Sequence, residues 1–371
     1  MRVRGWVTRG RRVRTTAVAA LLAGTASMAG AVPAAPAAGA ARAATAAEPV
    51  CEIRDKRLNE LSGMVATDDG YVVVNDGADD EARRRIFFLD KNCAVARTVS
   101  YPSRPRDTED VAIGRDGTIW VADIGDNDRN RETIALWRLA PSADEPVLYR
   151  MTYPDNPHDA EALLVDADGR PLVITKGGSG AVVLYRPTTA LKAGATTPLA
   201  TVGKVVLPPT TTSNPFSFVG RSVVTGAASA PDGRRVALRS YADAFEYDVT
   251  GGDVVAALTS GTPRITPLPD EPQGESITYS RDGRSLLTVS ESADQPAGSR
   301  PTILRYPATA APAGHPAEST TAVPPSAAAS PAAQAAGIGG AQVWSLAAGA
   351  GTLLALLAVA GLLWRRHTDR R

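Results

Sequence analysis

The chain has 371 residues, of which 44% are hydrophobic and 21% charged, and its formal net charge is +1. Residues 51–310 hold 36 acidic and 29 basic side chains, so this central part carries an excess of seven negative charges. An acidic body argues against nucleic acid as a partner, because such partners need a basic surface. It is compatible with cations, and negative charge also keeps secreted domains soluble.

The chain begins with a predicted export signal over residues 1–46. An arginine-rich start precedes a small-residue apolar core at 15–30, and Ala44-Thr45-Ala46 has the pattern of a signal-peptidase site. We therefore expect the mature chain to begin near residue 47 and to fold outside the cytoplasm.

Cys51 and Cys93 are the only cysteines in the sequence. Two cysteines in an exported protein most often form one disulfide. This bond would tie the start of the mature chain to the first repeat. A pair of buried free thiols is the alternative.

A hairpin signal repeats along the central part. An Asp-Gly pair between two apolar runs is typical of a β-hairpin, and a third and often a fourth strand follow each pair. The intervals between successive pairs are 47, 52, 64 and 50 residues. Four strands in about 40–50 residues are typical of one blade of a β-propeller. The five pairs are Asp69-Gly70, Asp116-Gly117, Asp168-Gly169, Asp232-Gly233 and Asp282-Gly283.

The repeats predict an all-β propeller over residues 47–307, with five blades. The last repeat lacks a fourth strand, which the segment near residues 50–54 can supply, so that the two ends of the domain close the ring and leave few open edges. Six blades are the alternative if 191–218 hides a degenerate blade. A β-sandwich is a second alternative, which explains the repeated hairpins poorly.

Acidic residues recur at one end of the predicted inner strands. Hairpin partners run antiparallel, so the start of the first strand and the end of the second lie at the same rim, away from the Asp-Gly turn. We therefore expect three glutamates to meet at one mouth. Seven residues before the turn aspartates stand Ser62, Glu109, Glu161, Thr225 and Glu275. Seven residues after them stand Asp76, Asp123, Thr175, Arg239 and Val289, with Lys176 and Glu291 slightly further along.

This mouth is a candidate site for calcium or another hard cation, which prefers oxygen ligands. The loop beside it has the Asp-x-Asp-x-Asn spacing that begins many calcium loops, but Arg131 stands where such a loop needs glycine. An ion-paired channel, neutralised by Arg129, Arg131, Arg239 and Lys176, is the alternative. The predicted ligands are Glu109, Asp123, Asp126, Asp128, Glu161 and Glu275.

Catalytic and ligand-binding roles can also be assigned at this rim. His158 lies three residues before Glu161 and is a candidate general base, as is Asp123. A loop histidine without chemistry is the alternative reading of His158. The residues predicted to contact a ligand are Glu109, Glu161, Glu275, Lys176, Arg239 and Tyr241.

The C-terminal part predicts a membrane anchor. Residues 308–340 are rich in Ala, Pro, Ser and Thr, which suits an extended stalk. Residues 341–364 form an apolar stretch long enough to cross a bilayer, and the basic tail 365–371 is expected in the cytoplasm. The sequence thus predicts a single-pass membrane protein with its propeller outside the cell.

Three segments carry a resemblance to a known family. TEDVAIGRDGTIWVADIGDNDRNR, HDAEALLVDADGRPLVITK and QGESITYSRDGRSLLTVSES resemble the exported actinobacterial β-propellers described as WD40-like or phytase-like, the latter named for an esterase-like activity of phytase. The resemblance covers about residues 55–307. Phytase-type propellers use calcium and many basic residues to bind phosphate, and this rim offers fewer basic residues than that chemistry needs.

Two functions follow as hypotheses. The first is a cell-surface binding or scaffold module with an acidic mouth, whose partner is an extracellular protein or a small ligand. The second is a metal-dependent hydrolase of a phosphoester, ester or lactone, in which the glutamates hold a calcium-type cation that activates water.

Overall fold

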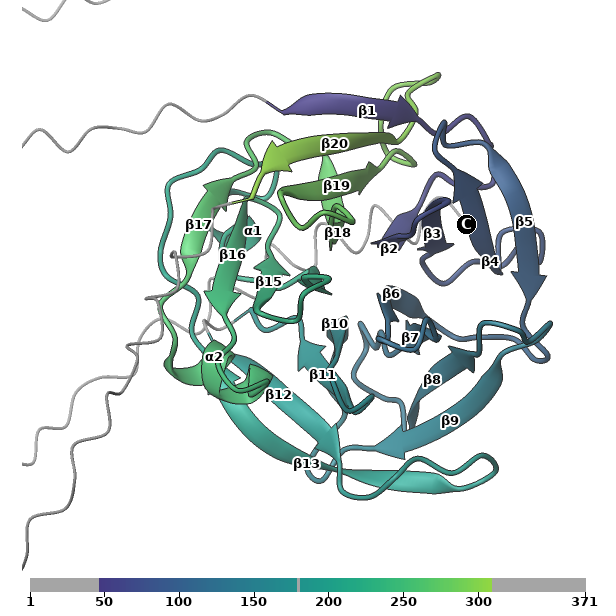
Figure 1. Cartoon of the computed structure of the whole chain (residues 1–371), viewed down its shortest axis with the longest axis vertical. Coiled ribbons are helices and arrows are strands. Elements are labelled where there is room, and N and C mark those ends of the chain that lie inside the picture. Colours follow the sequence, from purple (N-terminus) through teal and green to yellow (C-terminus); the bar gives the residue numbers. More distant parts are fainter. Residues whose placement is uncertain (1–46, 179–180, 309–371) are drawn as a thin grey trace, which may run out of the picture. The chain divides into compact units, whose positions relative to one another are not determined.

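The computed structural model describes residues 47–178 and 181–308 (Figure 1). Twenty strands form five antiparallel four-stranded units within these residues, and the two helices among them are short: α1 (Ser217–Gly220) and α2 (Val254–Ser260). Blade one holds β2 (Leu61–Ala66), β3 (Gly70–Asn75), β4 (Arg85–Asp90) and β5 (Val95–Ser100). Blade two holds β6 (Thr108–Ile113), β7 (Ile119–Asp123), β8 (Ile134–Leu139) and β9 (Val147–Thr152). Blade three holds β10 (Ala160–Val165), β11 (Pro171–Thr175), β12 (Val182–Pro187) and β13 (Thr196–Val205). Blade four holds β14 (Gly226–Ser229), β15 (Arg235–Arg239), β16 (Asp243–Asp248) and β17 (Arg264–Pro267). Blade five holds β18 (Gln273–Tyr279), β19 (Ser285–Glu291), β20 (Thr302–Pro307) and β1 (Glu48–Glu52).

The inner strands of the five blades form a closed ring, so the propeller prediction is confirmed. Each of β2, β6, β10, β14 and β18 packs against the next, and β18 packs against β2 (Figure 1). The segment 191–218, which a sixth blade would have occupied, contains one strand, β13 of blade three, and otherwise only loops and the start of α1. The glycine of each Asp-Gly turn has a positive φ, which side chains rarely adopt.

The N-terminal strand completes the last blade, as the sequence predicted. β1 pairs antiparallel with β20, and Cys51 at its end forms a disulfide with Cys93, which lies in the turn after β4. The bond therefore joins the outer edge of blade five to blade one, across the point where the ring closes. The alternative of two free thiols is wrong.

Burial explains why most side chains of the two inner strands of a blade are apolar. β2, β3, β10 and β11 are buried along their whole length, because each lies between neighbouring blades. Outer strands such as β5 and β9 expose several side chains. The core consists of side chains packed between successive blades, for example Leu164 and Leu184 of blade three against Leu238 and Phe245 of blade four. Full burial of one such side chain contributes roughly 1.5–3 kcal/mol.

One connection between blades was not expected. β13 is ten residues long, and its first three residues pair in parallel with β9, which joins blades two and three into one eight-stranded sheet. β13 also contacts α2, whose first turn is capped by the Asp253 side chain. These contacts cover an outer edge that would otherwise expose unpaired backbone groups.

The predicted signal, membrane segment and tail, at 1–46, 341–364 and 365–371, lie outside the described residues, as does the predicted stalk from residue 309 onward. Among the residues that the structure describes, no helix is long and apolar enough to cross a membrane.

Candidate cation-binding mouth

A bulge at the start of four inner strands aims the predicted mouth residues. The regular pairing skips one residue between Leu61 and Gly63, and likewise in β6, β10 and β18. A bulge leaves one extra residue unpaired and redirects its side chain. The skipped residues are Ser62, Glu109, Glu161 and Glu275, four of the five at the predicted offset. In blade four, Thr225 precedes a regularly paired strand.

Three carboxylates gather at one side of this mouth. One ligand oxygen from each of Asp76, Asp107 and Glu109 lies within 4.8 Å of the others. Asp76 follows β3 of blade one, and the other two belong to blade two. Gly125 packs against them, since a Cβ there would lie 2.6 Å from the Asp107 carboxylate and still closer to Glu109. We call Asp76, Asp107 and Glu109 the acid cluster.

Three further acids, Glu161, Glu275 and Glu291, interact with the acid cluster. Burial raises the pKa of Glu109 well above its usual value, and the charges of Glu161, Asp76, Asp107 and Glu275 raise it further. Burial also raises the pKa of Glu161 to about 8, despite the opposing effect of a nearby lysine.

The same environment acts on the remaining acids. The pKa of Asp76 is raised well above its usual value by burial and by Asp107 and Glu275, and that of Glu291 by burial and by Glu275 and Asp76. Six carboxyl groups thus share the mouth, and burial and repulsion between them oppose the charged forms of Asp76, Glu109, Glu161 and Glu291.

Lys176 is the only described residue that forms an ion pair with these six acids. Its Nζ lies 2.5 Å from Glu161 Oε1. Burial alone would lower the pKa of Lys176, but attraction to Glu161 and other acids holds it well above its usual value. One ammonium group cannot balance six carboxylates, so the ion-paired channel accounts for only part of the charge.

On the side of the mouth formed by blade five, uncharged side chains donate hydrogen bonds to the acids. Gln273 Nε2 donates to Glu275 at 3.1 Å and to Glu291 at 2.8 Å. The Tyr241 hydroxyl, which the sequence places at the same rim, donates to Glu275 at 3.4 Å. Glu291 is only 8% exposed, and its Oε1 is buried with no hydrogen-bond partner in the described structure. A buried carboxylate oxygen without a partner is costly unless a donor or a cation reaches it.

Asp123 lies behind the acid cluster rather than in it. Its carboxylate accepts hydrogen bonds from the backbone N–H groups of Arg106 and Asp107 and pairs with Arg131 at 2.9 Å. These donors occupy the carboxylate of Asp123, which was predicted as a general base and a cation ligand. Asp123 instead holds the backbone of Asp107 in place. The predicted neutralising residue Arg131 is likewise engaged with Asp123 and with the Gly125 carbonyl.

The loop with calcium-loop spacing does not fold as one. Asp126 uses both carboxylate oxygens to accept from the backbone N–H groups of Asn130 and Arg131, and Asp128 is exposed. Neither residue joins the acid cluster, the one group of three potential ligands that the described residues form. Asp126 therefore shapes the loop beside the mouth.

Two other predicted site residues point elsewhere. Arg239 is fully buried, donates to the Ser276 carbonyl and pairs with Glu271 at 2.5 Å, so it lies between blades four and five. His158 contacts Asp155 at 3.1 Å and the Tyr185 hydroxyl at 2.8 Å, and neither partner belongs to the six acids.

Asp107 was missed, although the repeat contains a signal for it. It stands nine residues before its turn aspartate, where the other blades have Glu60, Asp159, Val223 and Gln273. Gln273 bonds two mouth acids directly, and the charges of Asp159 and Glu60 raise the pKa of Glu161 and Glu291, respectively. Polar residues thus recur at two offsets, nine and seven, and both contribute to the mouth.

Asp110 joins the inner strands of three blades beneath the mouth. Its fully buried carboxylate accepts from the N–H groups of Leu163 in blade three, at 2.8 Å, and Ala227 in blade four, at 3.3 Å. The side chain of one blade therefore reaches the inner strands of two others across the ring.

No protein-family model matches the chain, and no curated protein sequence matches it. Solved structures of β-propeller proteins are similar to it at low identity. A gluconolactonase from Xanthomonas campestris is 14% identical, with a TM-score of 0.37 over 71% of this chain and 98% of its own. The PQQ-bound aldose sugar dehydrogenase from Streptomyces coelicolor is 14% identical, with a TM-score of 0.38 over 70% and 96%. A streptogramin B lyase is 12% identical, with a TM-score of 0.36 over 70% and 97%.

Proposed function

We propose that this propeller is a binding module that holds a divalent cation, with calcium as the best fit, in its acidic mouth and uses the cation to bind a ligand. The observation that carries the proposal is the 4.8 Å spacing within the acid cluster. Calcium binds oxygen at about 2.3–2.6 Å, so two ligands of one ion lie at most about 5 Å apart. Asp76, Asp107 and Glu109 therefore stand at distances that one ion can bridge without moving the strands.

Charge supports the same proposal. Burial and repulsion raise the pKa of Glu109 and Asp76, and a bound cation would offset both effects and favour the ionised forms. The cation would also give the buried Glu291 Oε1 a partner, either directly or through a bridging water. Lys176 already serves Glu161, so the acid cluster is the part of the mouth that still needs positive charge.

The donor set favours calcium over softer metals. The acid cluster contains carboxylates and neither histidine nor cysteine. All-oxygen sites suit calcium, magnesium or manganese, whereas zinc and copper favour nitrogen and sulfur. Calcium tolerates irregular geometry, which suits ligands that come from two different blades.

The location of the module belongs to the same proposal. The export signal at 1–46, the stalk at 308–340 and the membrane segment at 341–364 would place the propeller outside the cell on a single anchor. A phytase-like relationship would agree with calcium at the mouth. The partner would then be an extracellular protein or a small ligand with carboxylate or hydroxyl groups that complete the coordination of the ion.

A metal-dependent hydrolase of a phosphoester, ester or lactone is the second candidate, and Glu161 favours it. A carboxyl group with a pKa of about 8, beside a lysine and near the acid cluster, can accept and return a proton at neutral pH. The cation, when bound, would polarise the substrate and its water. Glu161 replaces His158 and Asp123 as the proposed base. The carboxylate of Asp123 is occupied by backbone N–H groups and by Arg131, and His158 contacts Asp155 and Tyr185.

The first experiment is a calcium titration of the thermal melting of the purified full-length chain. A ligand that binds only the folded state raises the melting temperature by mass action. We expect a saturable rise that Glu109→Gln weakens strongly and that the exposed control Glu132→Gln leaves unchanged. No rise with calcium, magnesium or manganese would contradict the cation site.

Turnover assays separate the two candidates. Hydrolysis of p-nitrophenyl phosphate, p-nitrophenyl acetate or a γ-lactone is measured with and without calcium. A hydrolase predicts calcium-dependent turnover that Glu161→Gln abolishes and His158→Gln preserves. Calcium binding without turnover on any of the three substrates would leave the binding module as the better account.

A further inference from the structure

The opposite end of the channel holds a cavity of about 420 Å³. It lies beside the Asp-Gly turns, since Gly117 and Gly233 line it, whereas the acid cluster lies at the other end of the inner strands. All five blades contribute to its wall, with Ala66, Val165 and Thr278 among the apolar and hydroxyl groups. This volume falls in the range of about 300–1,000 Å³ typical of small-molecule pockets.

Arginines dominate the charge of this cavity. Arg115, Arg235 and Arg281 line it against two acids, Asp166 and Asp232. Asp166 is already neutralised, because it pairs with Arg186 at 3.1 Å and with Arg170 at 3.3 Å. Two of the arginines are also ion-paired, Arg235 with Glu246 and Arg281 with Asp68, so Arg115 is the arginine of the wall without a carboxylate partner among the described residues.

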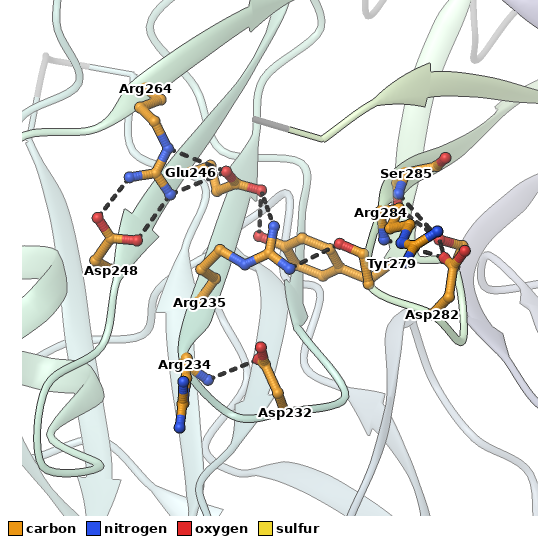
Figure 2. Close-up of polar contacts among 12 residues, drawn as sticks. Asp232, Arg234, Arg235, Glu246, Asp248, Arg264, Tyr279, Asp282, Arg284 and Ser285 are labelled. Atoms are coloured by element: carbon orange, nitrogen blue, oxygen red, sulfur yellow. Dashed lines mark hydrogen bonds and ion pairs between the residues drawn. The ribbon is translucent and has the colours of Figure 1, made fainter. Parts of the chain in front are cut away.

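Arg235 forms a fixed part of the wall. Figure 2 shows it between Glu246 and the ring of Tyr279. Its Nη2 donates to the Gly283 carbonyl at 2.7 Å. The Tyr279 hydroxyl donates to Glu246 at 2.9 Å, and Arg264 pairs with the same carboxylate at 3.0 Å. This network holds a buried guanidinium in place.

Arg115 is the group that a ligand can engage. Its guanidinium crosses from blade two to the turn of blade four and lies against Gly233, where a Cβ would overlap it. Across residues 47–178 and 181–308, no carboxylate lies within ion-pair distance of Arg115, whereas Arg281 is paired with Asp68 at 2.9 Å. A guanidinium carries five N–H donors in a planar fork that matches carboxylate and phosphate oxygens.

We propose that this cavity binds a small organic anion, a carboxylate or a phosphate compound, with Arg115 as its main partner. The apolar side chains of the wall contact the body of the ligand, and the guanidinium fixes its anionic group. Asp110 stands on β6 between Glu109 of the acid cluster and Ile113 of the cavity wall, and its carboxylate joins three inner strands there, so the two sites are built from different residues. The proposal therefore does not depend on the cation site.

The test is calorimetry of the purified full-length chain with inorganic phosphate and with succinate as probes. We expect saturable binding of at least one probe, about tenfold weaker or more in Arg115→Gln, as the loss of one charge-assisted pair predicts. The matched control is Arg97→Gln, an exposed arginine on β5 whose guanidinium lies over Phe88. That control and Glu109→Gln should bind the probe as the unaltered protein does.

A second variant keeps the proposal testable if Arg115→Gln fails to fold. Ala167 is an exposed turn residue of the cavity wall, and Ala167→Glu adds a negative charge there without opening the core. It should weaken anion binding by a similar factor. No saturable binding of either probe at millimolar concentration, or equal affinity in Arg115→Gln or Ala167→Glu, would overturn the proposal.

Discussion

Lys176 Nζ lies 2.5 Å from Glu161 Oε1, both side chains coming from blade three. This pair separates the two accounts of the mouth. In an ion-paired channel, the positive charge of Lys176 would stabilise the ionised forms of the buried acids. In a cation site, Lys176 neutralises Glu161 alone and competes electrostatically with the ion held by the acid cluster.

Lys176→Met should therefore tighten calcium binding. Removal of one positive charge several ångströms from the ion is worth about 1–2 kcal/mol at an effective dielectric constant near 20, which corresponds to about tenfold in affinity. Calorimetry of both proteins at one pH measures the ratio. Weaker calcium binding in Lys176→Met would show that the lysine helps to build the site rather than to oppose the ion.

The stability of the calcium-free protein should fall as pH rises from about 5 to 8. The folded-state pKa of Glu161 is about 8, above its ordinary value of 4.5, so the folded protein keeps a proton that the unfolded chain has released. The stabilisation present below pH 4.5 is lost as pH passes through 8. Urea unfolding in the presence of a chelator measures the effect.

Glu161→Gln should reduce this slope, because the amide does not titrate. Glu132→Gln, at an exposed loop position, is the control. Saturating calcium should reduce the slope as well, since the ion favours the ionised acids. A stability that does not change with pH in the calcium-free protein would mean that the mouth acids are solvated more fully than their burial indicates.

Arg239→Met should destabilise the fold without affecting calcium binding. Arg239 and Glu271 are both buried, and Glu271 also accepts from the Tyr306 hydroxyl at 2.7 Å and from Thr288 at 2.8 Å. Removing one partner leaves an uncompensated buried charge, which costs about 3–5 kcal/mol. Urea unfolding measures this loss of stability, and Arg97→Met is the surface control. A loss below about 1 kcal/mol would mean that the Arg239–Glu271 pair contributes no more than an exposed ion pair does.

The double variant Cys51→Ser/Cys93→Ser should lower the free energy of unfolding by roughly 3–4 kcal/mol, on the loop-entropy model. The disulfide spans 42 residues in sequence and joins β1 to blade one, so its loss frees the strand that closes the ring. Calcium affinity, measured well below the melting temperature, should not change, because neither cysteine contacts a mouth acid. Unchanged stability would mean that the pairing of β1 with β20 alone holds the closure.

The blades could be predicted from the sequence because their signals are local. Each Asp-Gly turn stands between two apolar runs, and the shortage of strands after Tyr306 requires a strand from the other end of the domain. Counting from the turns also placed Glu109, Glu161 and Glu275 at one rim. The bulges that aim these glutamates are not visible in the spacing, since an extra residue changes the pairing and not the hydrophobic pattern.

The partners of each charged residue could not be predicted, because they depend on how neighbouring blades pack. Arg239 occupies a position that would point into the mouth, but the buried Glu271 holds it between two blades. Asp123 meets the backbone of residues 106–107, a contact that arises only when the loop before β6 folds over β7. Asp126 follows a calcium-loop pattern, but both of its carboxylate oxygens accept hydrogen bonds from backbone N–H groups of its own turn.

The most direct measurement is the location of the ion in a crystal. Crystals of the protein grown with Mn²⁺, a hard cation with a strong anomalous signal, would be examined for anomalous density. The account predicts one peak in the mouth, in contact with oxygens of Asp76, Asp107 and Glu109 and lost in Glu109→Gln. Ordered density for these side chains without a peak, or a peak only at Asp126 and Asp128, would contradict the cation site.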